Sequence, residues 1–180
     1  QPIWRRTFLA PSLQWGKRTD VYPLEVLSNI LGGGASSRLY RRIVVNTKIA
    51  VSSGAYYDGD NRGPGRFVFY ASPRGDTSIE KLENSIAAEI ADIAKNGVTQ
   101  EEIQQAKGRM VSEAIYARDS LSGGARILGA ALAAGLTVED VENWPEHIAA
   151  VTKDEVQSAA NALFKEKNSV TGILLPIENR

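Results

Sequence analysis

The sequence has 180 residues, of which 43% are hydrophobic and 23% charged, so a hydrophobic core and a single domain are the natural expectation. Lys and Arg together number 21, as do Asp and Glu, and this balance argues against a general affinity for nucleic acid or an anionic membrane. Cysteine is absent and His147 is the single histidine, which excludes disulfides, thiolate zinc sites and a zinc site built on two or three histidines of this chain.

The first part of the chain predicts five elements around a run of glycines. The spacing of apolar residues indicates, in chain order, a strand over 6–10, a helix over 21–31, a short helix over 38–45, and strands over 49–57 and 66–72. We expect Asp20 to cap the first helix, Gly32–Gly34 to end it, and Ser36 or Ser37 to cap the second. Turn-forming residues fill the segment 58–65, so the two later strands are expected to form an antiparallel hairpin.

The second part predicts a series of helices followed by one strand. The expected elements are helices over 77–96, 99–118, 120–134, 137 to a break at Pro145, and 152–165, and a strand over 169–175. Three of the helix starts carry a capping box, Thr77–Glu80, Thr99–Glu102 and Thr152–Glu155. This order predicts an α+β fold over residues 1–180, with a mostly antiparallel or mixed sheet and the helices packed on one face.

Two features of the chain invite a catalytic or nucleotide-binding interpretation. The run Gly32–Gly34 lacks the Lys-Ser/Thr of a phosphate loop and follows a helix rather than a strand, so a helix end with a tight turn is the preferred interpretation over a nucleotide-binding module. Glu146 and His147 lack the further groups that acid–base catalysis requires, so we predict no catalytic residue here.

Three motifs recur in the order typical of one peptidase family. They are Leu31-Gly-Gly-Gly-Ala-Ser-Ser-Arg-Leu-Tyr40, Gly97-Val-Thr-Gln-Glu-Glu-Ile-Gln-Gln-Ala-Lys107, and Val151-Thr-x-x-Glu-Val156 before a helix and a strand ending in Leu175-Pro176. Together they resemble the C-terminal, non-zinc domain of pitrilysin/insulinase-family zinc metallopeptidases of the bacterial, mitochondrial-processing-peptidase-like type. The resemblance covers nearly the whole chain and implies the α+β half-domain that processing peptidases share with the core subunits of respiratory complexes.

The resemblance also implies where the chemistry lies. Such enzymes hold zinc on an inverted H-x-x-E-H motif in a different domain, and this chain has no such motif. We therefore expect no catalytic residue, metal site or cofactor in this chain, and zinc in the full-length enzyme. By resemblance, Gly33, Gly34, Ser36 and Ser37 would lie near the chamber that holds the peptide. The alternative is a non-catalytic scaffold or assembly subunit of the same fold.

Val44 and Val51 mark a departure from the family pattern. In many members an arginine and, seven residues later, a tyrosine hold the substrate backbone near the zinc, and alignment on Leu39-Tyr40 places these two valines at those positions. Valine can neither donate a hydrogen bond nor carry charge. The resemblance thus implies the C-terminal half of a zinc-bearing subunit, whose homologous partner supplies the arginine–tyrosine pair.

The expected partners follow from this assignment. They are the chain's own N-terminal zinc domain, a homologous subunit in a homo- or heterodimer, and a peptide substrate, with no nucleic acid. No apolar run approaches the ~20 residues of a membrane span, and Gln1–Arg6 lacks the apolar core of a signal peptide. Since the chain does not begin with Met, we expect an excised or processed piece. Bacterial relatives are often exported, which favours the periplasm over the cytoplasm.

Overall fold

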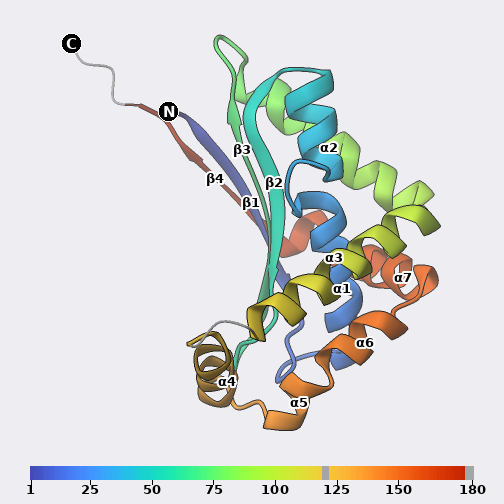
Figure 1. The fold of residues 1–180 in the computed structure, drawn as a ribbon. Coiled ribbons are helices and arrows are strands. Elements are labelled where there is room, and N and C mark those ends of the chain that lie inside the picture. Colours follow the sequence, from blue (N-terminus) through green and yellow to red (C-terminus); the bar gives the residue numbers. More distant parts are fainter. Residues whose placement is uncertain (119–121, 177–180) are drawn as a thin grey trace.

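The structure, a computed structural model, describes residues 1–118 and 122–176. Within these residues the centre of the fold is an antiparallel sheet with the strand order β2-β3-β1-β4. The strands are β1 (Ile3–Ala10), β2 (Ala50–Asp58), β3 (Gly65–Pro73) and β4 (Ser169–Leu174). The predicted hairpin of β2 and β3 is confirmed, and β1 lies between β3 and β4 (Figure 1).

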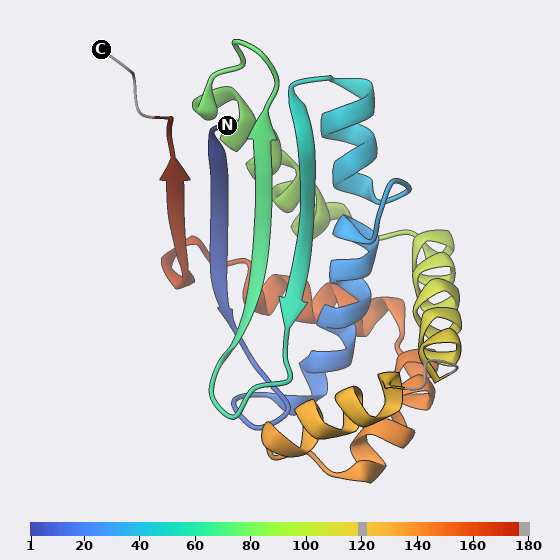
Figure 2. The ribbon, with the colours of Figure 1, turned by 60° about the vertical axis from the view of Figure 1, so that its left-hand side comes forward.

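The helices cover one face of this sheet, as Figures 1 and 2 show. They are α1 (Val21–Gly32), α2 (Ile79–Asn96), α3 (Gln100–Arg118), α4 (Gly123–Ala133), α5 (Val138–Glu142), α6 (Trp144–Ala150) and α7 (Lys153–Leu163). Helices α1, α2 and α7 contact the strands directly, whereas α3 and α6 pack on the outer side of α1. The predicted α+β class, with helices on one face of a mostly antiparallel sheet, is confirmed.

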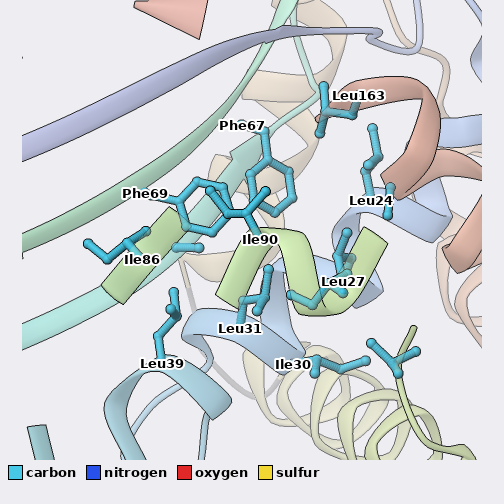
Figure 3. Close-up of a cluster of buried hydrophobic side chains, with 14 of the residues drawn as sticks. Leu24, Leu27, Ile30, Leu31, Leu39, Phe67, Phe69, Ile86, Ile90 and Leu163 are labelled. Atoms are coloured by element: carbon cyan, nitrogen blue, oxygen red, sulfur yellow. The ribbon is translucent and has the colours of Figure 1, made fainter. Parts of the chain in front are cut away.

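The main core lies between the sheet and α1, α2 and α7 (Figure 3). Figure 3 shows leucine side chains of α1 beneath the rings of Phe67 and Phe69 on β3, with Ile86 of α2 beside them. The Phe164 ring meets both rings at centroid distances of 5.5 and 5.6 Å. Burying each such side chain contributes about 1.5–3 kcal/mol, so this layer fixes the end of α1 against the sheet.

The second predicted helix differs in geometry from the expectation. A helical turn begins at Arg38, but Tyr40–Asn46 is a π-helix, in which backbone bonds span five residues instead of four. The N–H of Thr47 extends this pattern by donating to the carbonyl oxygen of Arg42 at 3.0 Å. Lys48 then has a φ of 56°, the left-handed conformation that glycine normally supplies. The wider turn changes which side chains share a face of this segment.

Side-chain capping agrees with the sequence at some helix starts and not at others. The boxes predicted at Thr99 and Thr152 are both present, each with reciprocal bonds to a glutamate three residues on. The box predicted at Thr77 is wrong. Thr77 instead closes a turn by donating its N–H to the carbonyl oxygen of Arg74, and Ser78 caps α2 with its hydroxyl oxygen. The cap is therefore shifted by one residue.

Two further expectations, both at helix starts, need correction. Asp20 holds the N-cap position of α1, but its carboxylate accepts from the lysine three residues earlier at 2.6 Å and not from the helix. The buried Oγ of Ser37 has no hydrogen-bond partner among the described residues, so the expected cap of the second helix is not formed. The predicted break near Pro145 is confirmed, because α5 ends at Glu142 and α6 begins at Trp144, with Pro145 in its first turn, where the missing N–H costs nothing. The predicted start at Ser120 lies outside the described residues.

Candidate functional site

The predicted substrate-binding residues lie in the turn between α1 and the π-helix. Gly32 approaches β2 so closely that a Cβ atom would meet the carbonyl oxygen of Ala55 at 2.0 Å. Gly34 has a φ of +91°, whereas Gly33 has an ordinary φ of −75°. Packing and backbone conformation therefore account for the first and last glycine of the run. Gly34 and Ser36 are exposed at this turn, so their atoms are accessible from solvent.

An open pocket of about 250 Å³ lies beside this turn, where the π-helix meets α1 and α3. Ser36 is the one predicted site residue that lines it. Four arginine side chains surround it, Arg38, Arg41, Arg42 and Arg109. The first three come from consecutive turns of one helical segment, and the fourth comes from α3, more than sixty residues later in the sequence. We refer to this feature as the arginine pocket.

Arg38 anchors the wall of the arginine pocket. Its Nε and Nη2 donate to the two carboxylate oxygens of Glu102 at 2.8 and 2.6 Å, and its guanidinium also reaches the carbonyl oxygen of Gly97 at 3.4 Å. Glu102 accepts the N–H of Thr99 as well. Burial alone would raise the pKa of Glu102, but the bonds from Arg38 and Thr99 outweigh it and hold that pKa below its usual value. The carboxylate is thus ionised and occupied by its own partners.

The other three arginines differ in the acceptors that their guanidinium groups find. Arg42 donates to Glu89 at 2.7 and 2.9 Å and to Asp92 at 3.1 Å, both on α2. Arg109 donates from Nη2 to the amide oxygen of Asn29 at 2.8 Å, and its buried Nε has no partner among the described residues. The Arg41 side chain is exposed and makes no hydrogen bond or ion pair within the described residues.

Val44 and Val51, aligned with the family's arginine–tyrosine pair, do not line this pocket. Val44 is 6% exposed and belongs to the main core. Val51 is 39% exposed and lies at a bulge of the edge strand β2, where the pairing with β3 shifts. Neither side chain supplies charge or a hydrogen bond at its position.

The side chain of His147 packs against an aromatic ring. Its ring stacks on Tyr22 with centroids 4.6 Å apart and an interplanar angle of 17°. Among the described residues there is no group of three or more His, Cys, Asp or Glu side chains that could hold a metal ion. None of the helices in that part of the chain is long and apolar enough to cross a membrane.

Sequence reasoning missed the arginine pocket and one buried acid. The spacing of Arg38 and Arg42 could have indicated a shared face, but nothing local to Arg109 connects it with them. From its sequence context, Glu25 of α1 is expected to be a polar surface residue of an amphipathic helix. Its carboxyl group instead lies beneath the surface, where burial raises its pKa to about 8 although the residue as a whole retains some exposure.

Comparisons with known proteins agree with this fold. Residues 7–110 match the family described as the peptidase M16 inactive domain. An uncharacterised zinc protease from Rickettsia felis is 28% identical over 144 residues, which are 80% of this chain and 34% of that protein. The chain thus spans about a third of the length of the curated relatives it matches.

Solved structures show the same fold. A protease from Helicobacter pylori has a TM-score of 0.88 at 22% identity, with 97% of this chain and 41% of that chain covered. The inactive peptidase domain of a putative zinc protease from Bordetella parapertussis has a TM-score of 0.87 at 21% identity, with 100% and 93% covered. The resemblance to the non-zinc domain of zinc metallopeptidases is confirmed, and the chain belongs to the peptidase M16 family through its inactive domain.

Proposed function

We propose that this chain is the C-terminal half-domain of a zinc endopeptidase and forms one wall of the chamber that holds the peptide. Zinc and the H-x-x-E-H motif would lie on an N-terminal half, where the motif glutamate activates water. The observation that carries this proposal is the match to the inactive domain, in a chain that spans about a third of relatives named zinc proteases. The lack of a metal-binding group among the described residues supports the same assignment of zinc to another domain.

The sheet offers a surface for the zinc-bearing half. Its face opposite the helices is uncovered in Figure 2, and apolar residues of β1 and β4 share this face with Arg5 and Thr7. Ile3, Leu9, Val170 and Leu174 are 42–74% exposed there, and Tyr56 and Tyr70 extend the same face on β2 and β3. Contiguous exposed apolar residues mark contact surfaces. Since the relatives contain about twice as much further chain, we propose that the N-terminal domain packs on this face.

The two valines support a further division between subunits. The family's arginine–tyrosine pair is replaced by Val44 in the core and Val51 on the edge strand β2. We propose that a homologous subunit supplies that pair across the chamber. A peptide bound in an extended form would pair with strand edges of the chamber wall.

The first test of this function compares the chain alone with the intact enzyme. Purified residues 1–180 with added zinc should cleave no peptide, whereas the full-length polypeptide with its partner subunit should cleave peptides and lose this activity on chelation. Zinc-dependent cleavage by residues 1–180 alone would contradict the proposal. An upstream half without H-x-x-E-H in the gene would instead favour the scaffold subunit.

The contact surface has its own test. Replacing Val170 and Leu174 by Asp should weaken association with a separately produced N-terminal half by at least about tenfold, because two exposed apolar contacts are lost. Replacing the exposed Ile115 and Tyr116 on α3 by Asp serves as a matched control. Equal loss in both variants would show that the β1–β4 face is not the contact surface.

A further inference from the structure

The peptidase function proposed above does not use the four arginines of the arginine pocket, which shares only Ser36 with the expected substrate-binding residues. That function assigns zinc to another domain and the substrate-holding pair to a homologous subunit, and the aligned positions Val44 and Val51 lie outside the pocket. The pocket nevertheless gathers four guanidinium groups in a space of about 250 Å³. Like charges at close range repel unless something neutralises them. The charge balance of the pocket therefore indicates what it can hold.

Carboxylates of the chain neutralise two of the four arginines. Arg38 is paired with Glu102 at 2.6 Å and lies 3.6 Å from Asp92, while Arg42 is paired with Glu89 and Asp92. Each of these acids is already engaged by hydrogen bonds from its arginine. These carboxylates have few free acceptor positions left for a third guanidinium group.

Arg41 and Arg109 carry the remaining charge. Neither forms an ion pair with a carboxylate of the described residues. Arg109 is held in place by its bond to Asn29, so its guanidinium is already oriented at the wall. Its Nε is buried without an acceptor, which is costly for a charged donor. Two cations on opposite elements thus face one space and lack an anion.

The rest of the lining is suited to a small polar ligand. Ser36, Asn46 and Gln105 contribute neutral hydrogen-bonding groups, and Ile30 is the apolar residue of the wall. The one lining carboxylate, Glu102, is occupied by Arg38 and by the N–H of Thr99. The positive charge of this lining disfavours a cation, and its polar groups disfavour a large apolar ligand.

We propose that the arginine pocket binds a small oxyanion, a phosphate or carboxylate group, held between Arg41 and Arg109. Planar guanidinium groups match the oxygens of such anions with paired, charge-assisted hydrogen bonds. Asn46 and Gln105 donate to the remaining oxygens. The bound anion accepts from the guanidinium groups of Arg41 and Arg109 and joins the π-helix to α3. The site goes beyond the peptidase role and is independent of zinc.

Inorganic phosphate is the first probe, added to residues 1–180 at constant ionic strength. The Bordetella parapertussis domain, of nearly the same extent, crystallised without a zinc half, which supports using this chain alone. Amide resonances of residues 36–46 and 102–109 should shift saturably in ¹⁵N-correlated NMR spectra. Acetate is the second probe and tests whether a carboxylate suffices. Saturable binding of either anion supports the site, whereas no saturable shift with both, or equal shifts with chloride, would overturn it.

Substitutions test whether Arg41 and Arg109 bind the phosphate. Arg41→Gln and Arg109→Gln should each weaken phosphate binding by about tenfold or more, because each removes a charged hydrogen-bond donor. Arg41 is exposed, so its substitution should leave the fold intact, and dispersed spectra verify this. Arg126→Gln on α4, an exposed arginine outside the pocket, is the matched control and should bind as the wild type does. Wild-type affinity in both pocket variants would disprove the assignment.

Discussion

The carboxyl group of Glu25 on α1 accepts a hydrogen bond of 2.7 Å from the indole Nε1 of Trp144 on α6. This bond joins two helices through residues that are 119 positions apart in the sequence, Glu25 and Trp144. Burial raises the pKa of Glu25 to about 8, the bond from Trp144 opposes this rise, and the nearby charge of Asp60 adds to it. The folded protein therefore favours the protonated carboxyl group at neutral pH.

This pair predicts a pH-dependent stability. The Glu25 pKa is higher in the folded state than its ordinary value of 4.5, so the folded state binds the extra proton. Its contribution is fully present below pH 4.5 and is lost as the pH rises to about 8, a change of roughly 5 kcal/mol. Glu25→Gln stays neutral and keeps an acceptor for Trp144, so its stability relative to wild type should rise over this range. Urea unfolding at several pH values measures this, and parallel pH profiles would contradict it.

The Arg38–Glu102 fork should contribute more stability than the neighbouring pairs of Arg42. The Arg38 side chain is 7% exposed and that of Arg42 is 44% exposed. Arg38→Met leaves Glu102 without its main partner and should lower the free energy of unfolding by about 2–3 kcal/mol. Arg42→Met breaks a more exposed pair and should cost less than about 1 kcal/mol. Chemical denaturation of both variants decides this, and losses of equal size would show that burial does not distinguish the pairs.

Two glycines should respond to alanine in opposite directions. A Cβ at Gly32 would overlap the backbone of Ala55, so Gly32→Ala should destabilise the fold by about 3 kcal/mol or more. Gly129 lies within α4 with nothing close to its Cβ position. Gly129→Ala should stabilise by about 0.5–1 kcal/mol, because alanine favours the helix. Thermal unfolding checks both, and an unaffected Gly32→Ala variant would show that α1 can move away from β2.

Lys48 is a site where glycine should stabilise the fold. Its φ of 56° costs an L-residue roughly 1–2 kcal/mol, and glycine avoids this cost. Lys48→Gly should therefore raise the free energy of unfolding by about 1 kcal/mol, measured by urea denaturation. Lys48→Ala removes the same side chain but keeps the strain, so it is the control and should not stabilise. A gain of equal size with alanine would assign the effect to the lysine side chain.

Local signals predicted most of the fold. Apolar spacing located α1, α2 and α3, and the capping boxes at Thr99 and Thr152 marked two helix starts because all their atoms come from neighbouring residues. The hairpin followed from its turn-forming segment. The box at Thr77 failed because the adjacent Ser78 offers the same hydroxyl one residue later.

Features that depend on tertiary packing were beyond sequence reasoning. The π-helix of Tyr40–Asn46 carries no distinct spacing signal, and it packs against β2. Arg109 joins the arginine pocket only because α3 crosses α1. Glu25 has the sequence context of a solvent-facing residue, but in the folded protein its carboxyl group is buried and accepts from Trp144 of the distant helix α6.

The pairing of β1 with β4 bears on how the chain folds during synthesis. Ile3 aligns with Leu174, so β1 gains its second neighbour only after β4, the last of the four strands in sequence order, has left the ribosome. Until then one row of β1 backbone groups lacks its native partner and can template the wrong pairing. Such distant contacts also slow folding, because a long loop must close before the contact forms. The exposed edge of β1 in the nascent domain is therefore a site at which a holding chaperone would protect the chain until β4 has been synthesised.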